Sequence, residues 1–144
     1  MTLMYASCVE FMKAGLLICG PTGSGKSDLC LRLIDAGAKL VSDDQTIVEN
    51  RNGKLIAGAP DSIKGMLEIR EIGIVETPFI DKTEIRLKLD LQSFVKIDRM
   101  PEMRTESIEN VAIPVFCLDA FSVSAVIKIK TFLSIQEQKR KLIT

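Results

Sequence analysis

Residues 15–27 read GLLICGPTGSGKS, and this stretch decides the fold. Gly15–Cys19 is a short apolar run of the kind that forms a buried strand, and Gly20–Ser27 matches the pattern G-x-x-x-x-G-K-[ST]. Apolar residues then recur at helical spacing through Lys26–Ala36, and Gly37 stands where a helix commonly ends. A strand, a glycine loop and a helix in this order predict a phosphate-binding loop of the P-loop type.

The expected nucleotide-binding residues are those of the loop itself: Gly20, Pro21, Thr22, Gly23, Ser24, Gly25, Lys26 and Ser27. The glycines permit backbone angles that turn successive amides toward an anion, and the start of the helix adds the positive end of its dipole. Lys26 supplies a charge for the β- and γ-phosphates of ATP or a related nucleotide, and the Ser27 hydroxyl can ligate Mg²⁺. The motif does not specify a reaction, because GTPases, metabolite kinases and transport ATPases share it.

Acidic residues follow the loop at the expected edge of the sheet. Asp43 and Asp44 come directly after the predicted strand Lys39–Ser42, and the carboxyl ends of parallel strands face the ligand crevice. One carboxylate there could hold magnesium and the other could accept the proton of an attacking hydroxyl. A turn-forming pair is the alternative. Glu68, between Leu67 and Ile69, could join this site or simply lie on the exposed face of an edge strand.

The remaining pattern indicates an α/β fold. The segments with strand character are Ala6–Phe11, Ile47–Glu49, Lys54–Ala57, Leu67–Val75, Glu84–Leu91 and Val111–Leu118. Asp98–Asn110 is polar and irregular, and Ser122–Gln138 is expected to form a closing helix. No repeat or linker is visible, so the sequence predicts a single domain over residues 1–144 with a central mixed sheet flanked by helices.

Composition excludes several classes of protein. Lysine plus arginine and aspartate plus glutamate both number 19, and this balance argues against a nucleic-acid partner. There is no apolar stretch long enough to span a membrane and no secretory signal, and the four cysteines have no metal-like spacing, so we expect a cytoplasmic protein with reduced thiols. Histidine is absent, so acid–base chemistry must fall to carboxylates, lysine, tyrosine or cysteine.

Three motifs together carry a family resemblance: GPTGSGKS at 20–27, KLVSDDQ at 39–45 and IKGMLEIREIGI at 63–74. From Met4 to Ile135 the chain resembles the catalytic domain of HPr kinase/phosphorylase, most of all the short alphaproteobacterial form without the amino-terminal domain. The resemblance implies ATP-dependent phosphorylation of a serine on HPr, or on a related phosphocarrier of the phosphotransferase system, in the regulation of carbon or nitrogen metabolism. Family members are commonly hexamers, so it also implies a homo-oligomer.

The resemblance also assigns roles to residues. Asp44 corresponds to the proton acceptor, Lys26 is catalytic, and Ser27 and Glu68 hold magnesium. We add Asp43 to the expected metal ligands. Asp98-Arg99-Met100 is similar to a family segment that carries a site arginine, so Arg99 is expected to be catalytic.

The chain departs from the family pattern at three places. Tyr5 stands about where members often have a histidine, and Glu71 replaces the first glycine of the LEIRGLGI run. Pro114–Ala120 lacks the arginine and glycine of the basic loop that full-length members use for dephosphorylation, so we expect that half-reaction to be weak or absent. Two alternatives stay open: a nucleotide-sensing regulator with little kinase activity, and a small-metabolite P-loop kinase.

Overall fold

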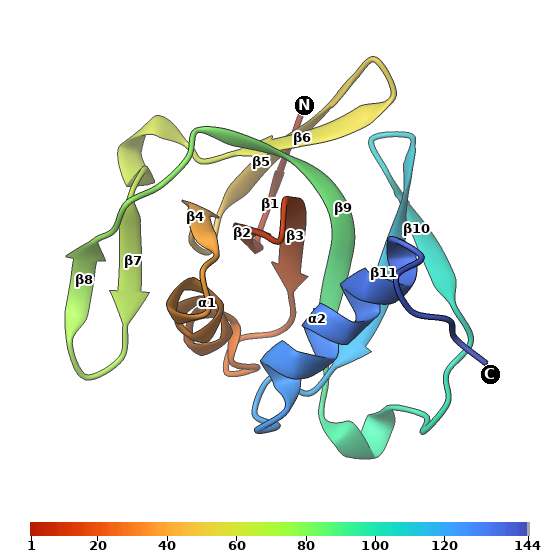
Figure 1. The fold of residues 1–144 in the computed structure, drawn as a ribbon. Helices are drawn as coiled ribbons and strands as arrows, with labels where there is room; N and C mark the ends of the chain where they lie inside the picture. Colours follow the sequence, from red (N-terminus) through yellow and green to blue (C-terminus); the bar gives the residue numbers. More distant parts are fainter. Residues whose placement is uncertain (144) are drawn as a thin grey trace.

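The structure, a computed structural model, describes residues 1–143 (Figure 1). The strands are β1 (Thr2–Met4), β2 (Ser7–Phe11), β3 (Ala14–Cys19), β4 (Lys39–Ser42), β5 (Thr46–Arg51), β6 (Lys54–Gly58), β7 (Met66–Ile69), β8 (Gly73–Glu76), β9 (Lys82–Leu91), β10 (Arg104–Ile108) and β11 (Val111–Leu118). The α-helices are α1 (Lys26–Asp35) and α2 (Ala125–Gln136), and two short 3₁₀ helices are η1 (Asp61–Ile63) and η2 (Phe94–Lys96). This is the predicted α/β fold with a mixed sheet and helices packed against it.

The main sheet has nine strands, and β9 lies at its centre. The order is β1-β5-β6-β9-β3-β2-β4, with β11 on β9 and β10 on β11. One edge of β9 pairs with β3, while the other edge pairs with β6 near its start and with β11 near its end. The long alternating run predicted at Glu84–Leu91 therefore forms the strand that joins the two halves of the sheet.

Strand direction brings several chain segments to one edge of the sheet. β3, β9 and β11 run parallel, and β4 runs the same way as β3 because both are antiparallel to β2. The carboxyl ends of all four strands therefore share an edge with the start of β2. Figure 1 shows the phosphate loop leaving the lower end of β3 toward α1 at this edge.

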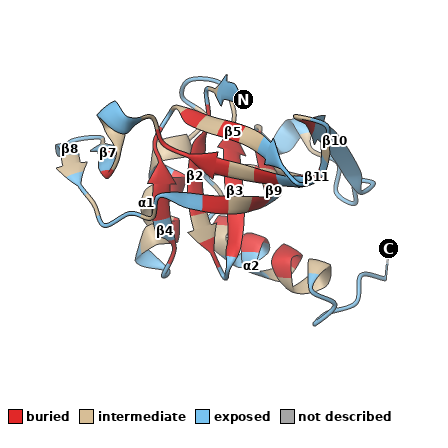
Figure 2. Cartoon of the chain, turned by 90° about the horizontal axis from the view of Figure 1, so that it is seen from above, coloured by how far each residue is buried: buried red, intermediate tan, exposed pale blue. Residues whose placement is uncertain are grey.

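Two hydrophobic clusters hold the fold together. Along β2 and β3, Val9, Leu16 and Ile18 belong to the cluster that packs against α1 and α2, whereas Cys8 and Leu17 belong to a second cluster. Alternate residues of a strand point to opposite faces of the sheet, so the central strands are covered on both sides. Figure 2 shows this burial in the central strands and the exposed positions in the β7–β8 hairpin.

The structure corrects two expectations about strands. Leu67–Val75 was predicted as one strand region, but β7 and β8 pair antiparallel as a separate two-stranded sheet. The chain turns between them because the Ile72 amide donates to the Ile69 carbonyl (3.1 Å) and Glu71 adopts φ 74°.

The segment 98–110, expected to be irregular, contains β10, which pairs with β11 through a turn with positive φ at Glu109 and Asn110. Residue alternation by itself cannot show where a strand reverses.

The predicted hairpin at 47–57 is confirmed. β5 and β6 pair antiparallel, and the Gly53 amide donates to Asn50 Oδ1 at 2.9 Å within the turn. In the described part of the chain, no helix has the length and apolar character needed to cross a membrane.

Candidate functional site

The phosphate loop has the backbone that its glycines require. A side chain at Gly20 would lie 2.5 Å from Ser24 Oγ and 3.0 Å from Leu91 Cβ, so only glycine fits between the loop and β9. Gly25 has φ 95°, a left-handed angle, and its carbonyl accepts the first helical hydrogen bond, from Leu29 N at 2.9 Å. The loop therefore closes directly onto the start of α1, where amides and the helix dipole favour an anion.

Two side chains of the loop fit a phosphate ligand. Lys26 Nζ donates to the carbonyl oxygens of Gly20 (2.7 Å) and Pro21 (3.4 Å), which places the ammonium against the loop itself. Ser24 Oγ is buried and has no hydrogen-bond partner among the described residues. A buried hydroxyl without a partner is costly, and a phosphate oxygen would supply an acceptor.

Asp43 connects the three sequence motifs. Its Oδ1 accepts hydrogen bonds from Ser27 Oγ (3.3 Å) and Ser7 Oγ (3.1 Å), and its Oδ2 accepts one from the Glu68 backbone amide (3.0 Å). The side chain is buried, so these donors replace the water that the carboxylate loses. The carboxylate thus joins the end of the phosphate loop to β2 and to β7.

Asp44 differs from its neighbour in exposure, backbone conformation and hydrogen bonding. Its side chain is exposed, whereas that of Asp43 is buried. Its backbone lies at φ 67°, which is uncommon for a residue with a side chain, and its amide donates to Ser7 Oγ at 3.0 Å. Residues held at sparsely populated backbone angles are frequent at functional positions.

Ser7 is a site residue that the sequence did not reveal. It is fully buried, and its hydroxyl donates to Asp43 while accepting from the Asp44 amide. In the sequence it belongs to a segment that was predicted only as a strand. A polar residue in an otherwise buried strand was the available signal.

Glu68 reaches the site through its backbone. The amide binds Asp43, and Leu67 anchors the strand in the core, while the Glu68 side chain is exposed. Within residues 1–143, no group of three or more histidine, cysteine, aspartate or glutamate side chains is arranged to hold one metal ion. The Ser27 hydroxyl and the Asp43 carboxylate that it contacts are oxygen donors of the kind that suits Mg²⁺, because this ion keeps several of its waters.

Arg99 lies apart from these residues. It follows the short turn Phe94–Lys96, in the segment between β9 and β10, and lines a hollow of about 450 Å³ with Phe116, Phe132 and Leu142. Among the described residues, no hydrogen bond or ion pair joins Arg99 to the phosphate loop. The structure therefore assembles the expected site from Gly20–Ser27, Asp43, Asp44 and β7, without Arg99.

The cysteines are free thiols, as expected. Burial raises the pKa of Cys19 to about 11 and that of Cys30 to about 12, and in Cys30 the nearby charge of Asp43 adds to the effect. Both are therefore neutral thiols at neutral pH and poor nucleophiles. Neither competes with the carboxylates as a base.

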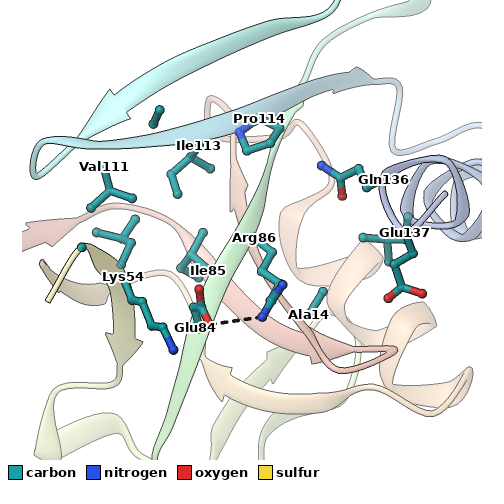
Figure 3. A pocket seen from close by; sticks show the side chains of 14 residues that line it. Ala14, Lys54, Glu84, Ile85, Arg86, Val111, Ile113, Pro114, Gln136 and Glu137 are labelled. Atoms are coloured by element: carbon teal, nitrogen blue, oxygen red, sulfur yellow. Dashed lines mark hydrogen bonds and ion pairs between the residues drawn. The ribbon is translucent and has the colours of Figure 1, made fainter. Parts of the chain in front are cut away.

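Another hollow, of about 350 Å³, lies at the opposite edge of the main sheet (Figure 3). Lys54, Glu84 and Arg86 line it from β6 and β9, and Arg86 pairs with Glu84 at 3.3 Å. The described residues that line it include none from the phosphate loop and neither aspartate of the site. Its position at the amino-terminal ends of β9 and β11 separates it from the phosphate loop.

Comparisons with known proteins point to one family. Residues 1–131 match the family model described as HPr Serine kinase C-terminal domain. An HPr kinase/phosphorylase of Clostridium tetani is 40% identical over 77 residues, which are 54% of this chain and 25% of that protein. One of Clostridium beijerinckii is 34% identical over 98 residues, 63% of this chain and 32% of that protein. The chain thus spans about a quarter to a third of the length of these curated relatives.

A solved structure extends the likeness to the whole fold. The structure of the Hpr(Ser) kinase/phosphatase from Coxiella burnetii superposes with a TM-score of 0.86 at 28% identity, covering 96% of this chain and 98% of that one. The resemblance carried by the three motifs is confirmed. The chain belongs to the HPr serine kinase C-terminal domain family.

Proposed function

We propose that this chain is an ATP- and Mg²⁺-dependent protein serine kinase whose substrate is HPr or a related phosphocarrier protein. The observation that carries the proposal is the set of hydrogen bonds around Asp43. Through it, one carboxylate holds Ser27 of the phosphate loop, the Glu68 strand and the serine that positions Asp44. A nucleotide phosphate, a metal and an acceptor hydroxyl would meet where these groups converge.

Each residue has a role in the transfer. Lys26 and the loop amides hold the β- and γ-phosphates and stabilise the charge that develops on them. Asp44 takes the proton of the substrate serine. The serine oxygen then bonds to the γ-phosphorus, and the bond from that phosphorus to the ADP oxygen breaks. Bound magnesium would neutralise phosphate charge, with Ser27, Glu68 and Asp43 as the residues to hold it. Arg99 is proposed as a further cation for this step; since no described hydrogen bond or ion pair joins it to the loop, the segment between β9 and β10 would have to bring it to the phosphates.

The kinase direction is proposed to dominate. Dephosphorylation by inorganic phosphate brings two anions together and needs extra positive charge between them. Most of Pro114–Ala120 lies in β11, and the Asp119 carboxylate accepts hydrogen bonds from two backbone amides. No cation comes from this segment, so release of pyrophosphate from phosphorylated carrier in millimolar phosphate should be far slower than the forward reaction.

The test is phosphate transfer from labelled ATP with magnesium to candidate phosphocarriers from the same genome. We expect labelled phosphoserine on a carrier with the native chain and about 10²–10⁴-fold less with Asp44→Asn, the usual range for a positioned base. Binding of ATP without transfer to any carrier would indicate a regulator instead. Sedimentation of the same samples tests the proposed homo-oligomer, and fractionation tests the proposed cytoplasmic location.

A further inference from the structure

An exposed aromatic ring lies directly against the phosphate loop. A methyl group in the Cβ position of Gly25 would lie 3.2 Å from Phe121 Cζ and 3.3 Å from Cε1. The tip of the ring therefore lies beside Gly25 of the loop, yet Phe121 is 66% exposed. Packing in the core does not account for a phenylalanine in this place.

The segment that carries Phe121 is held firmly. Asp119 Oδ1 accepts the Phe121 amide at 2.9 Å, and its Oδ2 accepts the Phe94 amide at 3.2 Å. The next carbonyl, that of Ala120, accepts a hydrogen bond from Arg32 of α1. Asp119 therefore fixes the loop after β11 to the turn after β9.

Phe94 is a second exposed aromatic residue, and its backbone is held by the same carboxylate. Its side chain is 71% exposed, and its amide shares the Asp119 carboxylate with that of Phe121. The two rings thus follow the ends of neighbouring parallel strands, β9 and β11, at the edge of the sheet that carries the phosphate loop. Ligands of open α/β sheets bind outside these strand ends.

We propose that Phe121, with Phe94, binds the base of the nucleotide whose phosphates occupy the Gly20–Ser27 loop. This subsite rests on the proposed function. Once the phosphates are fixed at the loop, the base can reach only as far as the ribose allows, and the Phe121 ring lies against that loop. Flat apolar rings stack on the face of any base, and larger bases bury more area, so the subsite should favour purines and distinguish poorly between adenine and guanine.

The experiment compares two ligands that differ in the base. Calorimetry measures the dissociation constants of Mg²⁺–ATP and of Mg²⁺–tripolyphosphate for the native chain and for Phe121→Ala. We expect the variant to bind ATP about tenfold more weakly and tripolyphosphate unchanged, because one stacking contact is lost. Val123→Ala, a change at a fully exposed position of the same loop, should leave both constants unchanged.

A second variant provides a spectroscopic signal. The chain contains no tryptophan, so Phe121→Trp introduces a single tryptophan beside the loop, which can be excited at wavelengths where Tyr5 does not absorb. ATP and GTP should change its emission and bind with near-native affinity, whereas tripolyphosphate should leave the emission unchanged.

The outcomes separate this inference from the proposed function. Native ATP affinity in both Phe121→Ala and Phe94→Ala would overturn the base subsite and leave the kinase proposal intact. Native ATP affinity together with a raised KM for the phosphocarrier would also overturn it, and would make the rings a protein-docking surface. If the native chain binds neither ATP nor tripolyphosphate, the proposed function itself fails.

Discussion

Two regions of the molecule bring acidic residues to the site, and they are built differently. Asp43 lies at the end of β4 in the main sheet, where it is buried and accepts three hydrogen bonds. Glu68 lies on the β7–β8 hairpin, a two-stranded sheet of its own, and its side chain is exposed. Leu67 is the only fully buried residue of that hairpin among those described.

The difference indicates which properties of the protein each region controls. The sheet edge fixes the phosphate loop and the aspartates through the core, so changes there should affect binding, chemistry and folding together. A two-stranded hairpin has little stability of its own, so its position depends on Leu67 and on the hydrogen bond to Asp43. Changes on the hairpin should therefore act on the metal, or on local stability, and leave the rest of the fold intact.

The largest effect is expected at the sheet edge with Lys26→Ala. This change removes the ammonium that lies against the loop, so transfer should fall by about 10³-fold or more and tight ATP binding should be lost. The measurement is labelled-phosphate transfer together with calorimetry, and Lys39→Ala, an exposed lysine of β4, is the control. Transfer at the native rate in Lys26→Ala would contradict the assignment of Gly20–Ser27 as the phosphate-binding loop.

Substitutions of the two aspartates at this edge should have different effects. Asp44→Asn should bind ATP normally while transfer falls as described above. Asp43→Ala leaves Ser7, Ser27 and the Glu68 amide without their acceptor, so unfolding free energy should fall by about 1–3 kcal/mol, as measured by urea denaturation. Normal transfer by Asp44→Asn and none by a stably folded Asp43 variant would reverse the two roles.

A smaller effect is expected on the hairpin with Glu68→Gln. The magnesium concentration for half-maximal transfer should rise about tenfold, with the melting temperature unchanged, because the backbone bond to Asp43 remains. Glu76→Gln is the matched control, since Glu76 is exposed on the paired strand. If both variants show the magnesium dependence of the native chain, Glu68 lies on the exposed face of a strand and does not bind the metal.

The smallest effect is expected at the turn of the hairpin with Glu71→Gly. Glu71 adopts φ 74°, which glycine takes without strain, so the change should stabilise the chain by about 1 kcal/mol. Thermal unfolding measures the gain. Asn52→Gly, at φ 54° in the β5–β6 turn, should gain less because asparagine tolerates this angle. A loss of stability in Glu71→Gly would mean that the carboxylate has a role that outweighs the strain.

Local patterns were enough to predict much of this protein. Glycine spacing and helical periodicity predicted the phosphate loop and α1, and the turn residues Asn50–Gly53 predicted the β5–β6 hairpin. These features depend on residues close together in the chain, where backbone preference and side-chain period act directly. The same reasoning placed Asp43 and Asp44 at the edge of the sheet that carries the loop.

Tertiary structure decided the rest. The sequence could not tell the buried Asp43 from the exposed Asp44, because the difference comes from contacts with distant residues, among them Ser7, which is 36 residues from Asp43. It did not show that the 67–75 segment reverses at Glu71, or that Phe121 meets Gly25 across the loop. These contacts arise from which strands pair and which faces are covered, and strand alternation specifies a face of the sheet without specifying the partner. The sequence alone therefore determined the chemistry available, while packing determined which neighbouring group each residue meets.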